Sequence, residues 1–266
     1  MIDGARWPRI AFRLVCGLIL FFLVFPSLLI VPISFSSSTA LQFPPPGLSL
    51  RWYRQFLGDP AWIDATLFSL QIATMTAISA TFVGIAAALA LVRGRVPGGE
   101  TLQTLLLAPL IVPHVIVAIA VYAQFAPLGL TGTRLGFVLI HTSLAVPYVV
   151  IIVSAALQRL PPSLEMAALN LGASRWQALR EVTLPLIAPA IGAGAVFAFL
   201  ASFDETVVSF FISGVEHKTV TRKLFEDIEF SLSPVIAAAS TVFVAVTVLL
   251  MLGADMARKT GRQAAT

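Results

Sequence analysis

Two adjacent carboxylates, Asp204 and Glu205, interrupt a long apolar segment at residues 186–212. An ionised carboxylate inside a bilayer costs at least about 2.5–3.5 kcal/mol, so such a group should face a cavity or a partner. An acid in this place could attract a cationic ligand. Neighbouring helix residues point about 100° apart, so only one of the two acids would face a cavity squarely. The alternative, which the sequence leaves open, is that these acids cap a broken helix or pair with another subunit.

The remaining reactive residue types form no recognisable catalytic pattern. No lysine follows a Gly-x4-Gly-Lys-Ser/Thr loop, so the chain cannot bind ATP through one. His141 and Ser143 lie close together, but no Gly-x-Ser-x-Gly motif supplies a nucleophile, and we interpret His141 as a polar helix residue. The single Cys16 excludes an internal disulfide and a cysteine-based zinc site. We therefore expect no catalytic site, no metal and no cofactor.

A second apolar segment, residues 101–126, contains Pro109, Pro113 and His114. Proline removes a hydrogen bond from a helix interior, so this pattern predicts a kink. Carbonyl groups freed there could line a cavity. We interpret His114 as a packed or interfacial histidine.

The composition is that of a membrane protein. Of the 266 residues, 58% are hydrophobic and 11% are charged, whereas a soluble domain carries roughly 25% charged residues. Transmembrane barrels show alternating segments of about ten residues, but the apolar runs here are long and unbroken. The sequence therefore predicts an all-α, polytopic membrane protein. Its sparse and scattered basic residues do not suggest nucleic acid binding.

Six segments are long enough to cross a bilayer, which takes about 20 apolar residues. They are residues 10–33, 66–92, 101–126, 135–157, 186–212 and 233–252. The first is too long for the core of a cleaved signal peptide, so we expect an uncleaved span. We expect residues 34–65 to be irregular and outside the bilayer, because they are rich in serine and proline. The expected divisions are residues 1–60, with the first span and its loop, a core at 61–255, and a tail at 256–266.

Basic residues indicate the orientation. Of the 17 lysines and arginines, 11 fall on the side of the two termini and 6 on the other side. Since cytoplasmic loops carry the excess of Lys and Arg, both termini should be cytoplasmic. The polar loop at residues 158–185 would then be cytoplasmic too.

This loop should contain a short surface helix. Pro161 and Pro162 end the preceding span, and Ser163 is a plausible N-cap, with Glu165 in the first turn. Gly172 is well placed to end the helix. Its apolar residues recur at helical spacing and form one stripe that a partner could cover: Leu164, Ala167, Ala168 and Leu171.

The same loop carries a family resemblance. Met166-Ala167-Ala168, Gly172, Val182 and Leu184-Pro185 fit Glu-Ala-Ala-x3-Gly-x9-Ile-x-Leu-Pro, the cytoplasmic signature of binding-protein-dependent ABC importer permeases. Met166 replaces the usual glutamate, with an acid one place earlier at Glu165, and Val182 replaces isoleucine. Over about residues 60–255 the chain resembles the spermidine/putrescine-type permeases, for example in Gly172-Ala173-Ser174-Arg175-Trp176 and Ser202-Phe203-Asp204-Glu205-Thr206.

The resemblance implies the type I ABC importer permease fold, with about six spans and a coupling helix between spans four and five. It implies a second homologous permease, two ATPase subunits and an external substrate-binding protein as partners in the bacterial inner membrane. The substrate would be a polyamine or similar cationic amine, with Asp204 and Glu205 on the translocation pathway. The residues expected to couple to the ATPase are Ser163, Leu164, Glu165, Met166, Ala167, Ala168, Leu171, Gly172, Ala173 and Ser174.

Three alternatives remain. The substrate could be a solute other than a polyamine. An ion-coupled secondary transporter would usually contain inverted repeats, and we see no convincing repeat within the six spans. An intramembrane hydrolase would need the nucleophile motif that is missing here.

Overall fold

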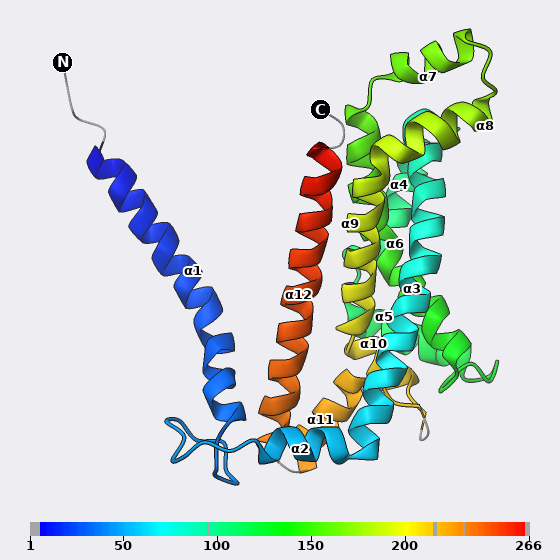
Figure 1. The fold of residues 1–266 in the computed structure, drawn as a ribbon. Helices are drawn as coiled ribbons and strands as arrows, with labels where there is room; N and C mark the ends of the chain where they lie inside the picture. The colour runs from blue at the N-terminus through cyan, green and yellow to red at the C-terminus, as the bar shows by residue number, and fades with distance from the viewer. Residues whose placement is uncertain (1–5, 95, 215–216, 231, 264–266) are drawn as a thin grey trace. The chain divides into compact units, whose positions relative to one another are not determined.

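The computed structural model describes residues 6–94, 96–214, 217–230 and 232–263, and they form an all-helical protein (Figure 1). Within these ranges no strand occurs beyond one isolated bridge between Ser36 and Leu48. The predicted fold class is confirmed. The last residues of the predicted tail, 264–266, lie outside the described residues.

The helices fall into two compact units. The first comprises residues 1–63 and 224–246, and the second comprises 64–223 and 247–266. The elements in chain order are α1 (Arg6–Ser34), α2 (Arg51–Gly58), α3 (Pro60–Arg93), α4 (Gly99–Leu107), η1 (Ala108–Leu110), α5 (His114–Phe125), α6 (Arg134–Arg159), α7 (Pro162–Asn170), α8 (Arg175–Ala178), the π turn η2 (Leu179–Thr183), α9 (Leu184–Phe203), α10 (Val207–Ile212), α11 (Val220–Phe230) and α12 (Val235–Gln263).

Five of the helical segments are each long and apolar enough to cross a membrane: Ala11–Ser34, Pro60–Arg93, Arg134–Arg159, Arg175–Phe203 and Val235–Gly253. The third predicted span is a pair of helices, Gly99–Leu110 and His114–Phe125, bent by 97° at the proline-rich break. Counting that pair as one span gives six. The fifth span ends at Phe203, so its predicted continuation as a helix to Ile212 is wrong.

In the first unit, side chains of α2 fasten it to the end of α1. Trp52 donates from its indole nitrogen to the carbonyl of Ser36 over 2.8 Å, and Tyr53 shares a 2.7 Å hydrogen bond with Ser34. The segment predicted to be irregular is therefore irregular only as far as Leu50, because α2 and the start of α3 occupy the rest.

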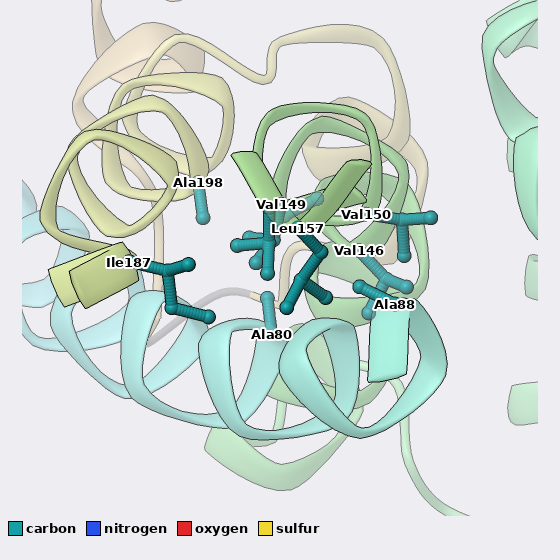
Figure 2. Packing of buried hydrophobic residues seen from close by; sticks show 10 residues of the cluster. Ala80, Ala88, Val146, Val149, Val150, Leu157, Ile187 and Ala198 are labelled. Atoms are coloured by element: carbon teal, nitrogen blue, oxygen red, sulfur yellow. The ribbon is translucent and has the colours of Figure 1, made fainter. Parts of the chain in front are cut away.

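The core of the second unit lies between α3, α6 and α9, which run side by side (Figure 1). Of the candidate spans, α6 is the most deeply buried. Figure 2 shows Val149 of α6 among the buried aliphatic side chains. A Cβ atom on Gly84 of α3 would lie 2.6 Å from Val149, and one on Gly194 of α9 would lie 3.3 Å from it. The two glycines thus let three helix backbones approach one another around a single valine.

Candidate functional site

The first candidate site is α7 and its flanks, at one end of the α6–α9 pair (Figure 1). The predicted helix is present, but Ser163 is not its N-cap. The helix begins at Pro162 with Pro161 as the N-cap, and no side chain caps it. Proline suits the first helical position because its fixed φ is already helical and its missing N–H would lack a partner there.

Gly172 ends α7 as predicted. Its φ is +90°, a conformation that glycine adopts without steric cost. The N–H of Ala173 donates to the carbonyl of Ala168 and that of Gly172 to Leu169, over 3.1 and 3.0 Å. These two bonds form a Schellman motif, which satisfies the last carbonyls of the helix.

The next helix starts at once with a capping box. The Ser174 hydroxyl accepts from the N–H of Gln177 over 3.2 Å, and the Gln177 side chain accepts from the N–H of Ser174 over 2.8 Å. This reciprocal pair satisfies two donors that a helix start would otherwise leave free. Between α7 and α8 the backbone is therefore fixed by four hydrogen bonds.

From Arg175 the chain runs as one helical segment to Phe203, with the π turn η2 inside it. Pro185 follows the turn and has no N–H to donate to the preceding helical turn, so regular α-helical bonding is interrupted here. Isolated π turns are frequent at functional sites in helices.

Glu165 joins α7 to the ends of two spans. One oxygen of its carboxylate accepts from Nε of Arg93, the last residue of α3, and from the hydroxyl of Thr183 in the π turn, each over 3.0 Å. Arg93 also donates from Nη2 to the carbonyl of Leu160 at the end of α6, over 2.8 Å. We call this set of contacts, among Arg93, Leu160, Glu165 and Thr183, the latch.

The side chains around the latch divide into an inner and an outer set. Glu165, Ala168 and Ala173 are half-buried. The other residues expected to couple to a partner are exposed: Ser163, Leu164, Met166, Ala167, Leu171, Gly172 and Ser174. Leu171 exposes 90% of its surface, and Trp176 exposes 64%. Met166 makes no ion pair in place of the glutamate it replaces, whereas Glu165, one position earlier, does.

The second candidate site lies at the other end of α9, where the fifth span breaks. Asp204 caps the end of α9, and α10 begins at Val207, so neither carboxylate is inside a continuous helix. Asp204 is exposed, and its carboxylate makes no hydrogen bond or ion pair with any residue that the structure describes. Glu205 is buried, with 8% of its surface exposed.

Both oxygens of the Glu205 carboxylate are engaged. Oε1 accepts from the N–H of Val208 over 2.9 Å and so caps the start of α10. Oε2 lies 3.1 Å from Nδ1 of His114, the first residue of α5. The main-chain carbonyl of Glu205 accepts from the Thr221 hydroxyl over 3.2 Å. The pair of His114 and Glu205 thus joins the break in the third span to the break in the fifth.

His141 of α6 also contacts the helices that flank this break. Its ring is 1% exposed, with Nδ1 2.8 Å from the hydroxyl of Ser202 in α9 and Nε2 3.2 Å from the hydroxyl of Ser209 in α10. One imidazole therefore bridges the two helices on either side of the break. His141 is a polar helix residue, as expected, and its hydrogen bonds go to Ser202 and Ser209 and not to Ser143.

Sequence reasoning missed most of these partners. Nothing in the sequence marks Arg93 or Thr183 as a partner of Glu165. His114 and Glu205 stand far apart in the chain, so no spacing connects them. The signals that could have found them are the polar residues themselves, since a polar group in a membrane segment requires a partner.

Five helical segments long and apolar enough to cross a membrane, with a bent pair that would make a sixth span, define a multi-pass membrane protein. Residues 80–261 match the family described as "Binding-protein-dependent transport system inner membrane component", and the chain belongs to this family. It is a permease subunit of an ABC importer and a protein of the inner membrane.

Curated relatives agree. The chain is 35% identical over 228 residues to the putrescine transport system permease protein PotI of Escherichia coli strain K12, covering 83% of this chain and 81% of the relative. It is 30% identical over 206 residues to the spermidine/putrescine permease PotC of Haemophilus influenzae, covering 77% and 80%. The molybdenum permease ModB of E. coli strain K12 is 33% identical over 181 residues, covering 62% of this chain and 78% of the relative.

Solved structures confirm the fold. A chain of a bacterial ABC transporter that imports the acidic polysaccharide alginate matches with a TM-score of 0.72 at 16% identity, covering 97% of this chain and 98% of that one. A chain of an amino acid ABC transporter matches with a TM-score of 0.59 at 15% identity, covering 79% and 98%.

Proposed function

We propose that α7 is the coupling helix of this importer, the element through which a partner ATPase moves the membrane-spanning helices. The observation that carries the proposal is the division of α7 into an exposed apolar side and an inward carboxylate tied to α3 and η2. A subunit without its own ATP site must receive work through a contact surface. A rigid helix tied to several spans can pass rigid-body motion to all of them.

The exposed side has the chemistry of a protein contact. Leu164, Met166 and Leu171 leave 42%, 55% and 90% of their surfaces uncovered. Exposed apolar area in water costs about 25 cal/mol per Å², so a partner that covers these side chains is stabilised by doing so. Two ATPase subunits, each docked on one permease, would cover α7 of this chain and the equivalent helix of a second, homologous permease.

The orientation follows from the same proposal. With α7 facing the ATPases, both termini lie in the cytoplasm, which agrees with the excess of Lys and Arg on that side. A substrate-binding protein would then dock on the opposite face of the membrane. The divisions expected at residues 1–60, 61–255 and 256–266 remain part of this proposal.

The proposed substrate is a polyamine or a similar cationic amine. PotI and PotC carry putrescine or spermidine in their names, whereas ModB is named for molybdenum, so membership of the family alone leaves the solute open. The exposed Asp204 favours a cation over an oxyanion, because an uncompensated carboxylate in a low-dielectric pathway attracts positive charge and repels negative charge. Asp204 and Glu205 are the proposed pathway acids, with Asp204 the one available to a ligand.

Copurification tests the coupling helix. Leu171→Glu should prevent the ATPase from copurifying with the permease pair in detergent, because it places a charge at the highly exposed leucine that directly follows α7. Leu128→Glu is the matched control, since Leu128 is also an exposed leucine in a turn but follows α5 at residues 126–129. Undiminished recovery of the ATPase with Leu171→Glu would refute the docking surface.

Thermal unfolding of the associated binding protein tests the substrate. Putrescine or spermidine should raise its melting temperature, because a ligand that binds only the folded state stabilises it. A shift with molybdate and none with either amine would overturn the assignment. In membrane vesicles, uptake should require ATP, and uptake driven by an ion gradient alone would contradict the proposed energy source.

A further inference from the structure

The two neighbouring acids at the break in the fifth span have opposite surroundings. Asp204 is exposed and makes no polar side-chain contact with a described residue, whereas Glu205 is buried and has both carboxylate oxygens occupied. A ligand at this place could reach Asp204 directly. It could reach Glu205 only by displacing His114 or the N–H of Val208.

The non-helical residues between α9 and α10 need polar contacts from side chains to hold their conformation. No regular ladder of helical hydrogen bonds continues from α9 into α10, and polar main-chain groups in a membrane must find partners within the protein. Glu205 supplies one partner to α10, and its carbonyl accepts from Thr221 at the start of α11. His141 bridges the two sides of the break through Ser202 and Ser209.

His114 extends this network to another broken span. It is the first residue of α5, directly after Pro113, where the third span bends by 97°. Its side chain is 43% exposed, while that of Glu205 is 7% exposed, so the contact lies at the edge of the core. The α5 and α10 helices also pack against each other along their lengths.

We propose that Glu205 is a positioning residue and not a ligand for the substrate: by clasping His114 and capping α10, it fixes the direction in which Asp204 is presented. Loss of His114 removes the clasp alone, whereas loss of Glu205 removes both the clasp and the cap on α10. Once Glu205 is gone, the further loss of His114 therefore has no additional consequence for Asp204. The role of this contact in transport rests on the proposed function of Asp204. The claim that the contact orients Asp204 does not rest on that function.

Labelling of a cysteine at the break tests the clasp without knowledge of the substrate. Cys16 is the only cysteine in this sequence, so Asp204→Cys in a Cys16→Ser background gives this subunit a single thiol, and labelling in the full complex is read from the band of this subunit. The rate of its modification by a positively charged methanethiosulfonate reagent is measured in membranes. His114→Phe and Glu205→Met, which keep side-chain volume but remove the polar contact, are added singly and together.

Each single variant should change the labelling rate in the same direction by about fivefold or more, and the double variant should differ from Glu205→Met alone by less than about twofold. Ser79→Ala is the matched control. It removes a 2.6 Å hydrogen bond to Thr142 between α3 and α6 that involves neither His114 nor Glu205, and should leave the rate unchanged.

Multiplying effects in the double variant, or no effect of His114→Phe, would overturn the proposal. If Glu205→Met does not assemble, His114→Phe decides the matter alone, because His114 is partly exposed and on a different helix. Uptake of radiolabelled putrescine is measured with the native Asp204 and Cys16. If labelling follows the prediction but the unsubstituted complex takes up no putrescine, the substrate assignment fails and the clasp stands.

Discussion

Arg93 and Glu165 lie 3.0 Å apart and join the last residue of α3 to the first turn of α7. Arg93 also donates to the carbonyl of Leu160, which caps the end of α6, and Glu165 also accepts from the hydroxyl of Thr183, directly before α9. Three helices that form the core of the second unit therefore meet α7 at one small polar cluster. A displacement of α7 acts on all three at once.

The latch should be measurable as a coupling energy. Arg93→Met and Glu165→Met should each lower the melting temperature of the purified complex. The double variant should lose less stability than the two single variants lose in sum. Because both side chains are partly exposed, at 21% and 24%, we expect a coupling of about 0.5–1 kcal/mol. Glu181→Met, which removes an exposed acid from the same loop, should show no coupling with Arg93. Additive effects of Arg93 and Glu165 would argue against the latch.

Close packing around Val149 predicts a contrast between two glycines. Gly84→Ala should destabilise the complex by about 1–3 kcal/mol, because its methyl group would overlap a β-branched side chain that cannot turn away. Gly192→Ala meets nothing within 4 Å in this chain and should be neutral or gain up to about 1 kcal/mol of helix propensity. Thermal unfolding in detergent compares the two. Equal effects would mean that α3 and α6 are not in close contact at Gly84.

The bridge made by His141 should contribute to stability. His141→Leu removes two hydrogen bonds between helices and leaves the hydroxyls of Ser202 and Ser209 to find other partners. We expect a loss of about 1 kcal/mol, since such bonds in membrane proteins are individually modest. Denaturant titration of the purified complex measures it. An unchanged midpoint with His141→Leu would show that the bridge does not hold the break.

Asp204→Asn should reduce uptake without dissociating the complex. The amide keeps the size of the side chain but no longer attracts a cation, and the loss of one such contact at about 1.4 kcal/mol lowers affinity roughly tenfold. Initial rates over a range of putrescine concentrations measure the change. Glu100→Gln, an exposed acid on α4, serves as control. Normal uptake by a well-assembled Asp204→Asn complex would remove Asp204 from the mechanism.

Much of the fold could be predicted from the sequence because span length and apolar composition are local properties. The end of α7 at Gly172 and the bend near Pro113 were likewise predictable from single residues with strong backbone preferences. The predicted start of α7 is wrong by two residues, since Ser163 is a good N-cap in general but Pro162 is a better first residue and makes Pro161 the N-cap.

The contacts of the sites were beyond such reasoning. The segment through Asp204 and Glu205 is apolar enough to suggest one continuous helix, and only tertiary partners reveal the break. Glu205 finds His114 on another broken helix, and Glu165 finds Arg93 at the end of α3. These pairings depend on how the helices pack, which no spacing in the chain encodes.

The backbone conformation is restricted on both sides of α7, so the loop has little freedom to bend. Pro161 precedes the helix and Pro162 is its first residue, and a Schellman motif followed immediately by a capping box leads out of it. A flexible linker would absorb a push as local bending. If α7 is the coupling helix that we propose, a displacement by the ATPase would pass to α3, α6 and α9 with little loss to bending of the loop.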